Sequence, residues 1–139
     1  MIAVRVQSAA FDLAGEAALL TADRNDIGAV VTFAGLVRDI PLTLEHYPGM
    51  TERQLEAIAA EAEARWPVLA GTVIHRHGDL APGDPIVLVA IAAAHRSEAF
   101  EAAAFLMDWL KTRAPFWKRE GDAWVEAKAS DDDAAARWS

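Results

Sequence analysis

Four cationic residues lie close together near the C-terminal end of the chain, in the segment 111–120, which reads Lys-Thr-Arg-Ala-Pro-Phe-Trp-Lys-Arg-Glu. Pro115 lacks a backbone donor and disfavours helical geometry at the preceding residue, so a helix that arrives from upstream should end just before it. Lys111 then lies on the last helical turn and Lys118 on the next element. Such a break can direct both ammonium groups into one cavity, with one of the aromatic residues 116–117 as an apolar wall. The helix dipole alone also favours cations at a helix C-terminus, so this segment does not establish a site by itself.

Further cationic residues lie at the ends of other predicted elements. Arg38 closes a strand predicted for residues 29–38, and His95 and Arg96 lie between another strand and a helix that Ser97 is predicted to cap. The N-terminus of a helix presents free N–H groups and partial positive charge, and an arginine beside it can bind a phosphate through two hydrogen bonds. We infer that these groups and the two lysines could converge on one anionic, phosphate-bearing ligand.

Each of these positions also has a purely structural interpretation. Arg38 can be a solvated strand end, and His95 can be a hydrogen-bonded core histidine. Arg96 can form an ion pair with Glu98 or Glu120. The residue types alone therefore leave both interpretations open.

Other kinds of site have less support in the sequence. His75 and His77 alternate with Arg76 on a predicted strand and should face the same side, but no cysteine or third histidine nearby completes a metal site, and His46 is remote in sequence. We therefore expect no metal. Glycine-rich nucleotide-binding motifs are absent, and no serine occurs in a nucleophile elbow.

The bulk composition restricts the class of protein. The 139 residues suffice for one domain, residues 1–139, with a hydrophobic core. A net charge of −8 argues against nucleic acid as the main partner. The longest apolar run, 86–94, is about half of a membrane span, and no signal-peptide pattern opens the chain, so we expect a cytoplasmic protein without a membrane partner. The chain has no cysteine, so any sulfur chemistry needs sulfur from another molecule.

Hydrophobic patterning predicts strands separated by single helices. Strands are predicted over 2–7, 29–38, 42–47, 72–77 and 86–94, and helices over 11–23, 52–66 and 97–112. Residues 117–120 and 123–128 are predicted to form a hairpin, followed by a last short helix that ends near Trp138. We expect Thr51 to cap the helix 52–66 and strand 42–47 to pair with the strand before it. This order favours an α+β fold with mainly antiparallel sheet.

Four segments together resemble the large, catalytic subunits of molybdopterin synthase. They are Gly-Ala-Val-Val-Thr-Phe-Ala-Gly-Leu-Val-Arg over 28–38, Leu-Glu-His-Tyr-Pro-Gly-Met over 44–50, Ala-His-Arg-Ser over 94–97, and the segment 111–120. Trp-Val-Glu-Ala over 124–127 and the terminal Ala-Arg-Trp are also similar. Each motif alone is modest, but the four occur in the same order, and the resemblance extends from about residue 28 to residue 138.

The resemblance implies an α/β hammerhead fold and a homodimer. It also implies a heterotetramer in which each large subunit binds one small, ubiquitin-like subunit. The C-terminal Gly-Gly tail of that small subunit carries a thiocarboxylate, enters a pocket of the large subunit and donates sulfur to cyclic pyranopterin monophosphate. Two transfers form the dithiolene of molybdopterin. Such a sulfurtransferase needs no cofactor, and it accounts for the absence of cysteine because the sulfur arrives on the partner.

The resemblance also assigns residues to the site. Lys111 and Lys118 match the two essential lysines, with Lys118 near the acyl carbonyl of the tail and Lys111 near the substrate. Further positions match the substrate pocket, namely Phe33, Arg38, His95, Arg96, Arg119, Glu120 and Lys128. A lysine that is desolvated and crowded by other cations suits proton transfer, whereas a charged lysine would stabilise the tetrahedral oxyanion. Both roles remain open.

Some positions depart from the family pattern. The loops at 39–41 and 120–121 are shorter than usual, either because this protein is trimmed or because residues are missing from the sequence. Lys128 replaces a common arginine and loses its bidentate geometry, and Leu36 stands where a polar residue is frequent. Two other functions therefore remain as alternatives. One is a non-catalytic dimeric scaffold for a ubiquitin-like partner, and the other is an enzyme that binds phosphate esters without a protein partner.

Overall fold

The computed structural model describes residues 1–120, 123–125 and 135–138, and all structural statements refer to these residues. The elements follow in the order β1 (Ile2–Gln7), α1 (Leu13–Thr21), β2 (Ala29–Leu36), β3 (Leu42–His46), α2 (Met50–Arg65), β4 (Val68–Arg76), β5 (Gly78–Leu80), β6 (Pro85–Ala93), α3 (Arg96–Arg113), β7 (Phe116–Glu120) and β8 (Ala123–Val125). The predicted α+β class with mainly antiparallel sheet is confirmed.

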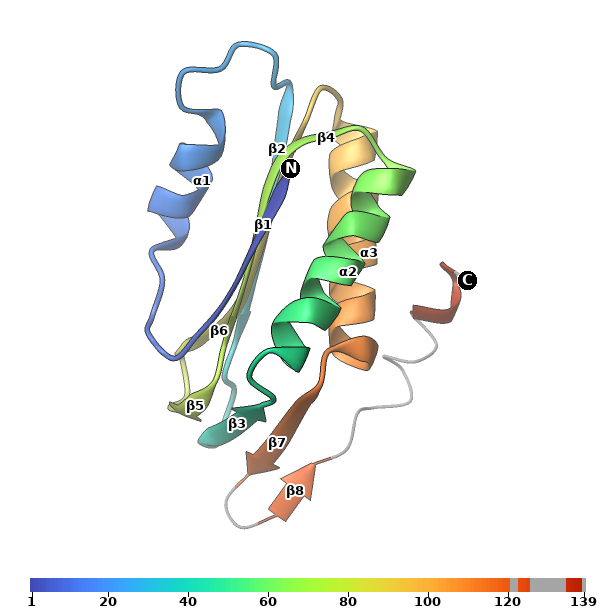
Figure 1. The fold of residues 1–139 in the computed structure, drawn as a ribbon. Helices are drawn as coiled ribbons and strands as arrows, with labels where there is room; N and C mark the ends of the chain where they lie inside the picture. Colours follow the sequence, from blue (N-terminus) through green and yellow to red (C-terminus); the bar gives the residue numbers. More distant parts are fainter. Residues whose placement is uncertain (121–122, 126–134, 139) are drawn as a thin grey trace.

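The larger sheet has the strand order β1-β4-β6-β2, in which only the β1–β4 pair is parallel. Helix α1 covers one face of this sheet, and α2 and α3 cover the other (Figure 1). β6 lies between two strands and between two helical layers, so residues 87–93 are all buried. A strand that is covered on both faces has a continuous run of apolar residues. This run explains why a strand could be predicted for this segment from the sequence.

Helix α3 packs on the sheet through a stripe that only partly matches the one its sequence predicts. The buried positions are Ala99, Ala102, Ala103, Phe105, Leu106 and Leu110. The sequence predicts a buried stripe with Phe100, Ala104, Met107 and Leu110 or Phe105. The prediction was right for Leu110 and Phe105 and wrong for Phe100, whose ring is 61% exposed. Small alanine side chains let the helix approach the sheet closely, whereas the hydropathy of the helix sequence alone does not distinguish the two stripes.

The smaller sheet has the order β5-β3-β7-β8, and each of its pairs is antiparallel. The prediction that β3 pairs with β2 was therefore wrong. The chain leaves the first sheet after Val37, whose N–H donates to the Asp84 carbonyl and whose carbonyl accepts from Gly83 N–H. Asp39 then adopts φ = 70°, a left-handed conformation that redirects the chain toward β5 and β7.

Both predicted N-caps lie two residues after the N-cap in the structure. The N-cap of α2 is Gly49 and that of α3 is His95, so Thr51 and Ser97 lie inside the first turns. The predicted hairpin near the C-terminus is present as β7 and β8, but its continuation through 128 and the predicted start of the last helix lie outside the described residues. Among the helices that are described, none has the length and hydropathy that a membrane span requires.

Thr51 joins three elements at the lower end of the fold. Its side chain is fully buried, accepts a hydrogen bond from Tyr47 N–H at 2.9 Å and donates one to the Pro115 carbonyl at 3.1 Å. The hydroxyl therefore ties the end of β3 and the start of α2 to the residue that precedes β7. This contact fixes the position from which β7 begins.

We predict that Thr51→Val destabilises the protein by about 1–3 kcal/mol, because a buried N–H and a buried carbonyl lose their partner while the side-chain volume is retained. Urea denaturation measures this difference. Thr43→Val is the matched control, since the Thr43 hydroxyl bonds Asp79 in an exposed position and its loss should cost much less. Equal effects of the two substitutions would contradict the prediction.

Candidate functional site

The two lysines of segment 111–120 reach one region from different elements. Helix α3 ends at Arg113, and Ala114 is extended with φ = −72° and ψ = 126°. Pro115 cannot donate a helical hydrogen bond and favours this conformation before it. Strand β7 begins at the next residue, so Lys111 lies in the last turn of α3 and Lys118 in the middle of β7. The predicted break is confirmed.

A row of three residues across the larger sheet forms one side of this region. Val87 on β6 is paired with His75 on β4 and with Gly35 on β2. Directly paired residues present their side chains on the same face of a sheet. A Cβ on Gly35 would lie 2.9 Å from Val87 Cγ1, so the glycine keeps this end of the row open.

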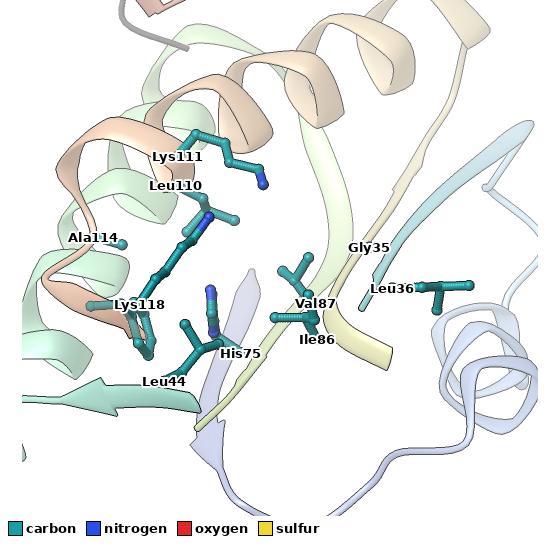
Figure 2. Close-up of a pocket in the computed structure, with 11 residues that line it drawn as sticks. Gly35, Leu36, Leu44, His75, Ile86, Val87, Leu110, Lys111, Ala114 and Lys118 are labelled. Carbon is teal, nitrogen blue, oxygen red and sulfur yellow. The ribbon is translucent and has the colours of Figure 1, made fainter. Parts of the chain in front are cut away.

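A pocket of about 130 Å³ lies between this row, the end of α3 and strands β3 and β7 (Figure 2). Its remaining walls are mostly apolar and consist of Leu36, Leu44, Ile86, Leu110, Ala114 and Phe116. Leu44 is paired directly with Lys118, which explains why both face the same space. Of the two aromatic residues considered as a wall, Phe116 lines the pocket, whereas Trp117 packs edge-on against Tyr47 at 4.2 Å.

The polar side chains that line the pocket are those of His75, Lys111 and Lys118, and its described lining includes no aspartate or glutamate. The chain contains only three lysines, and two of them lie here. An apolar surrounding strengthens electrostatic interactions relative to water. The pocket therefore suits an anion, although the chain as a whole carries a net charge of −8.

His75 is the uncharged member of this group. Its ring stacks on Phe116 with 3.8 Å between ring centroids and 18° between planes. Burial lowers the pKa of His75 to about 4, and the charges of Lys111 and Lys118 act in the same direction. Its Nδ1 lies 2.9 Å from the Arg76 carbonyl oxygen, which can only accept, so Nδ1 carries the proton. In the neutral ring Nε2 is then a hydrogen-bond acceptor.

Two of the predicted substrate-binding residues lie two positions along the chain from residues that line the pocket. Phe33 is on the same face of β2 as Gly35, with a ring carbon 3.5 Å from the position of a Cβ on that glycine, and it is 41% exposed. Arg38 follows the pocket residue Leu36 by two positions, and its exposed side chain forms an ion pair with Asp39 at 3.6 Å. Neither Phe33 nor Arg38 is among the residues that line the cavity.

The predicted residues after Lys118 are divided between the two faces of β7. Arg119 has the strand parity of Trp117 and faces away from the pocket, whereas Glu120 has the parity of Lys118 but lies exposed at the strand end. The prediction for Lys128 falls on a residue that is not described.

His95 and Arg96 lie at the opposite end of α3 from the pocket. Both are exposed, and with Gly28 and Ser97 they line a separate open hollow. Fifteen residues of helix separate Arg96 from Lys111, which corresponds to roughly 22 Å. A single chain therefore does not bring all the predicted cations together.

Sequence reasoning did not assign His75 to the site. Its alternation with His77 was examined only as a metal pattern, and the structure points the two rings to different neighbours, because His77 stacks on His46 at 3.9 Å. Within the described residues, no cluster of three or more metal-ligating side chains occurs. One signal in the sequence could have identified His75. It follows Val73 by two residues on the same strand, and Val73 faces the core, so the alternation of the strand directs His75 to the same side.

Comparison with known proteins places this chain in a family. A family model described as "MoaE protein" matches residues 6–113. The chain belongs to the MoaE protein family. A relative from Mesorhizobium japonicum, named molybdopterin synthase catalytic subunit, is 57% identical over 146 residues, covering 97% of this chain and 92% of the relative. That aligned length exceeds the 139 residues of this chain, so the relative has residues without a counterpart here.

Solved structures of family members share the fold. Molybdopterin cofactor biosynthesis protein E from Burkholderia multivorans has a TM-score of 0.89 and 55% identity, covering 99% of this chain and 97% of its own. A more distant fold match is a complex of subunits 1 and 2 of molybdopterin-converting factor from Helicobacter pylori. It has a TM-score of 0.70 and 22% identity, with 91% of this chain and 90% of that chain covered. The family and the fold inferred from the four motifs are thus confirmed.

We predict that His75 makes stability fall on the acid side of neutrality. Its folded pKa of about 4 lies below the ordinary value of 6.5, so the unfolded chain takes up the proton first as the pH falls. The contribution is constant above pH 6.5 and decreases by about 1.4 kcal/mol per pH unit toward pH 4. Urea denaturation at several pH values should show a shallower acid slope for His75→Phe, and an identical slope would contradict this assignment.

Proposed function

We propose that this chain is the catalytic subunit of a molybdopterin synthase and transfers sulfur from a thiocarboxylated small subunit to cyclic pyranopterin monophosphate. The observation that carries the proposal is the apolar pocket into which Lys111 and Lys118 project from two different elements. Membership of the MoaE family and the name that its relatives bear agree with this chemistry. The chain itself supplies no thiol, because it lacks cysteine.

The shape of the pocket suits the proposed sulfur donor. A cavity of about 130 Å³ with apolar walls accepts a narrow, extended segment more readily than a bulky side chain. A Gly-Gly tail has no side chains, and its terminal thiocarboxylate is the anion that two ammonium groups would attract. The small subunit would then bind outside the pocket while its last residues lie inside it.

The two lysines would act at the transferred group. During transfer, the acyl carbon of the tail passes through a tetrahedral state in which negative charge develops on its oxygen. A lysine ammonium placed beside that oxygen in a dry pocket stabilises this charge without reorganisation. We assign Lys118 to the acyl oxygen and Lys111 to the substrate side of the pocket. Arg38 and Phe33 would contact the substrate at the opening.

We predict that Lys118→Ala reduces the single-turnover rate of sulfur transfer by at least about 100-fold, the effect of removing one oxyanion-stabilising donor. The assay mixes the purified chain with thiocarboxylated small subunit and cyclic pyranopterin monophosphate and follows dithiolene formation. Arg113→Ala is the control, because Arg113 is a nearby cation in the last turn of α3 that pairs with Glu61 and does not line the pocket. Normal turnover by Lys118→Ala would refute the proposal.

Binding measurements made alongside this transfer assay separate the two alternative functions. Tight binding of the small subunit by the wild-type chain without product would favour the scaffold. Binding of a phosphate monoester that is unaffected by the small subunit, measured by calorimetry, would favour the independent phosphate-ester enzyme.

We further propose that the chain works as a homodimer in which His95 and Arg96 of one chain serve the pocket of the other. Both residues lie roughly 22 Å of helix away from Lys111 of their own chain, which is too far for one small substrate. They form an exposed cationic hollow at a helix N-terminus, an arrangement that suits a phosphate. In a two-fold dimer each such hollow can face the pocket of the neighbouring chain.

Mixing two inactive variants tests this arrangement. We predict that Lys118→Ala and Arg96→Ala, each inactive alone, regain about a quarter of the wild-type activity when mixed and allowed to exchange chains, because half of the dimers are hybrids and each hybrid has one intact site. Activity is measured by the transfer assay after exchange. If both residues act within one chain, no hybrid has an intact site and mixing restores nothing.

A further inference from the structure

The pocket combines two side-chain donors with a single side-chain acceptor. The ammonium groups of Lys111 and Lys118 can only donate hydrogen bonds, and the remaining described lining residues, apart from His75, have aliphatic or aromatic side chains or none. The His75 ring is therefore the one lining side chain, among the residues that the structure describes, that can accept a proton of a lysine ammonium.

The position of the His75 ring is fixed on two sides. Nδ1–H donates to the Arg76 carbonyl, and the ring face stacks on Phe116. These contacts direct Nε2 away from the backbone of β4. Figure 2 shows a nitrogen of this ring directed toward the part of the pocket where the lysine side chains end.

Lys118 lies on the same strand as Phe116, the residue that stacks on this ring. It follows Phe116 by two residues on β7, so both side chains have the same strand parity and both line the pocket. The stacking partner of His75 and the lysine are thus held by one strand. Lys111 reaches the pocket from the exposed end of α3 instead.

We propose that His75 is a positioning residue for sulfur transfer, in which Nε2 accepts a hydrogen bond from the Lys118 ammonium and holds it charged and directed at the acyl oxygen of the bound tail. This inference rests on the proposed function for its catalytic consequence, but the contact itself can be tested without the small subunit. The charged groups that face His75 are Lys111 on α3, Lys118 on β7 and, when protonated, His77 beyond the end of β4.

The ring remains an acceptor throughout the neutral range. Burial lowers the pKa of His75 to about 4, and both lysines and His77 act in the same direction. Below that pH the ring would become a donor at both nitrogens and would repel the ammonium. The arrangement therefore works only with a neutral imidazole.

The first test measures how fast Lys118 is acylated by an amine-directed reagent at fixed neutral pH, with peptide mass spectrometry to separate the three lysines of the chain. Only the uncharged amine reacts. Loss of an acceptor for a charged group should raise the uncharged fraction, so His75→Phe should label Lys118 about tenfold faster. His75→Gln retains a side-chain oxygen as an acceptor and should label at a rate near that of the wild type. His77→Phe is the matched control, because it removes a nearby histidine that does not line the pocket and stacks on His46 instead.

The second test measures single-turnover sulfur transfer by the same variants, together with their affinity for the small subunit and their unfolding midpoints. We expect His75→Phe to slow transfer about tenfold or more with unchanged affinity, and His75→Gln to recover most of the rate. Wild-type labelling and transfer in His75→Phe would overturn the proposal, as would a change in labelling confined to Lys111. A uniform change of all three lysines with a lowered unfolding midpoint would instead show a merely structural role and also overturn it. If labelling changes as expected but the wild-type protein transfers no sulfur, the contact stands and the proposed function fails.

Discussion

The termination of α3 at Ala114 and Pro115 is the constraint on which the pocket depends. In an uninterrupted helix, residues 111 and 118 would lie on one face about 10 Å apart, and both would project from α3 in the same direction. The break instead turns the chain into β7, which pairs with β3 and returns toward the sheet. The Thr51 hydroxyl holds the Pro115 carbonyl at this turn. Two lysines that are near in sequence thereby approach one cavity from two sides.

The electrostatic potential of this cavity is positive because its described lining has two lysines and no acidic residue. Two like charges in an apolar recess repel each other, and the described residues that line the pocket include no aspartate or glutamate. An anion that binds between the two lysines reduces this repulsion, so the arrangement favours binding of an anion. A permanent carboxylate at the same place would stabilise the free protein and compete with the ligand. The acidic residues that give the chain its net charge of −8 can remain elsewhere without this effect.

Sequence patterns predicted local features well and non-local pairing poorly. The β6 run and the break at Pro115 were predicted because each depends on neighbouring residues. The partner of β3 was wrong because strand pairing depends on where distant segments meet, here on the Val37 contacts and the turn at Asp39. His75 was missed as a site residue for the same reason. Its role comes from a row across three strands and a stacking partner on β7, and no local motif encodes either.

The length of α3 explains why the predicted cations do not meet in one chain. An 18-residue helix is about 27 Å long, so groups at its two ends can act together on a small substrate only when two chains are combined. Motif matching identifies the residues at both ends of α3. It shows which residues are present in a sequence, but it does not show to which chain's site they contribute. If both ends contact one substrate, the pocket is complete only in the assembled dimer. Isolated chains would then keep the lysine pair and its affinity for the anionic tail, but would lack the second cationic surface that a phosphate-bearing acceptor requires.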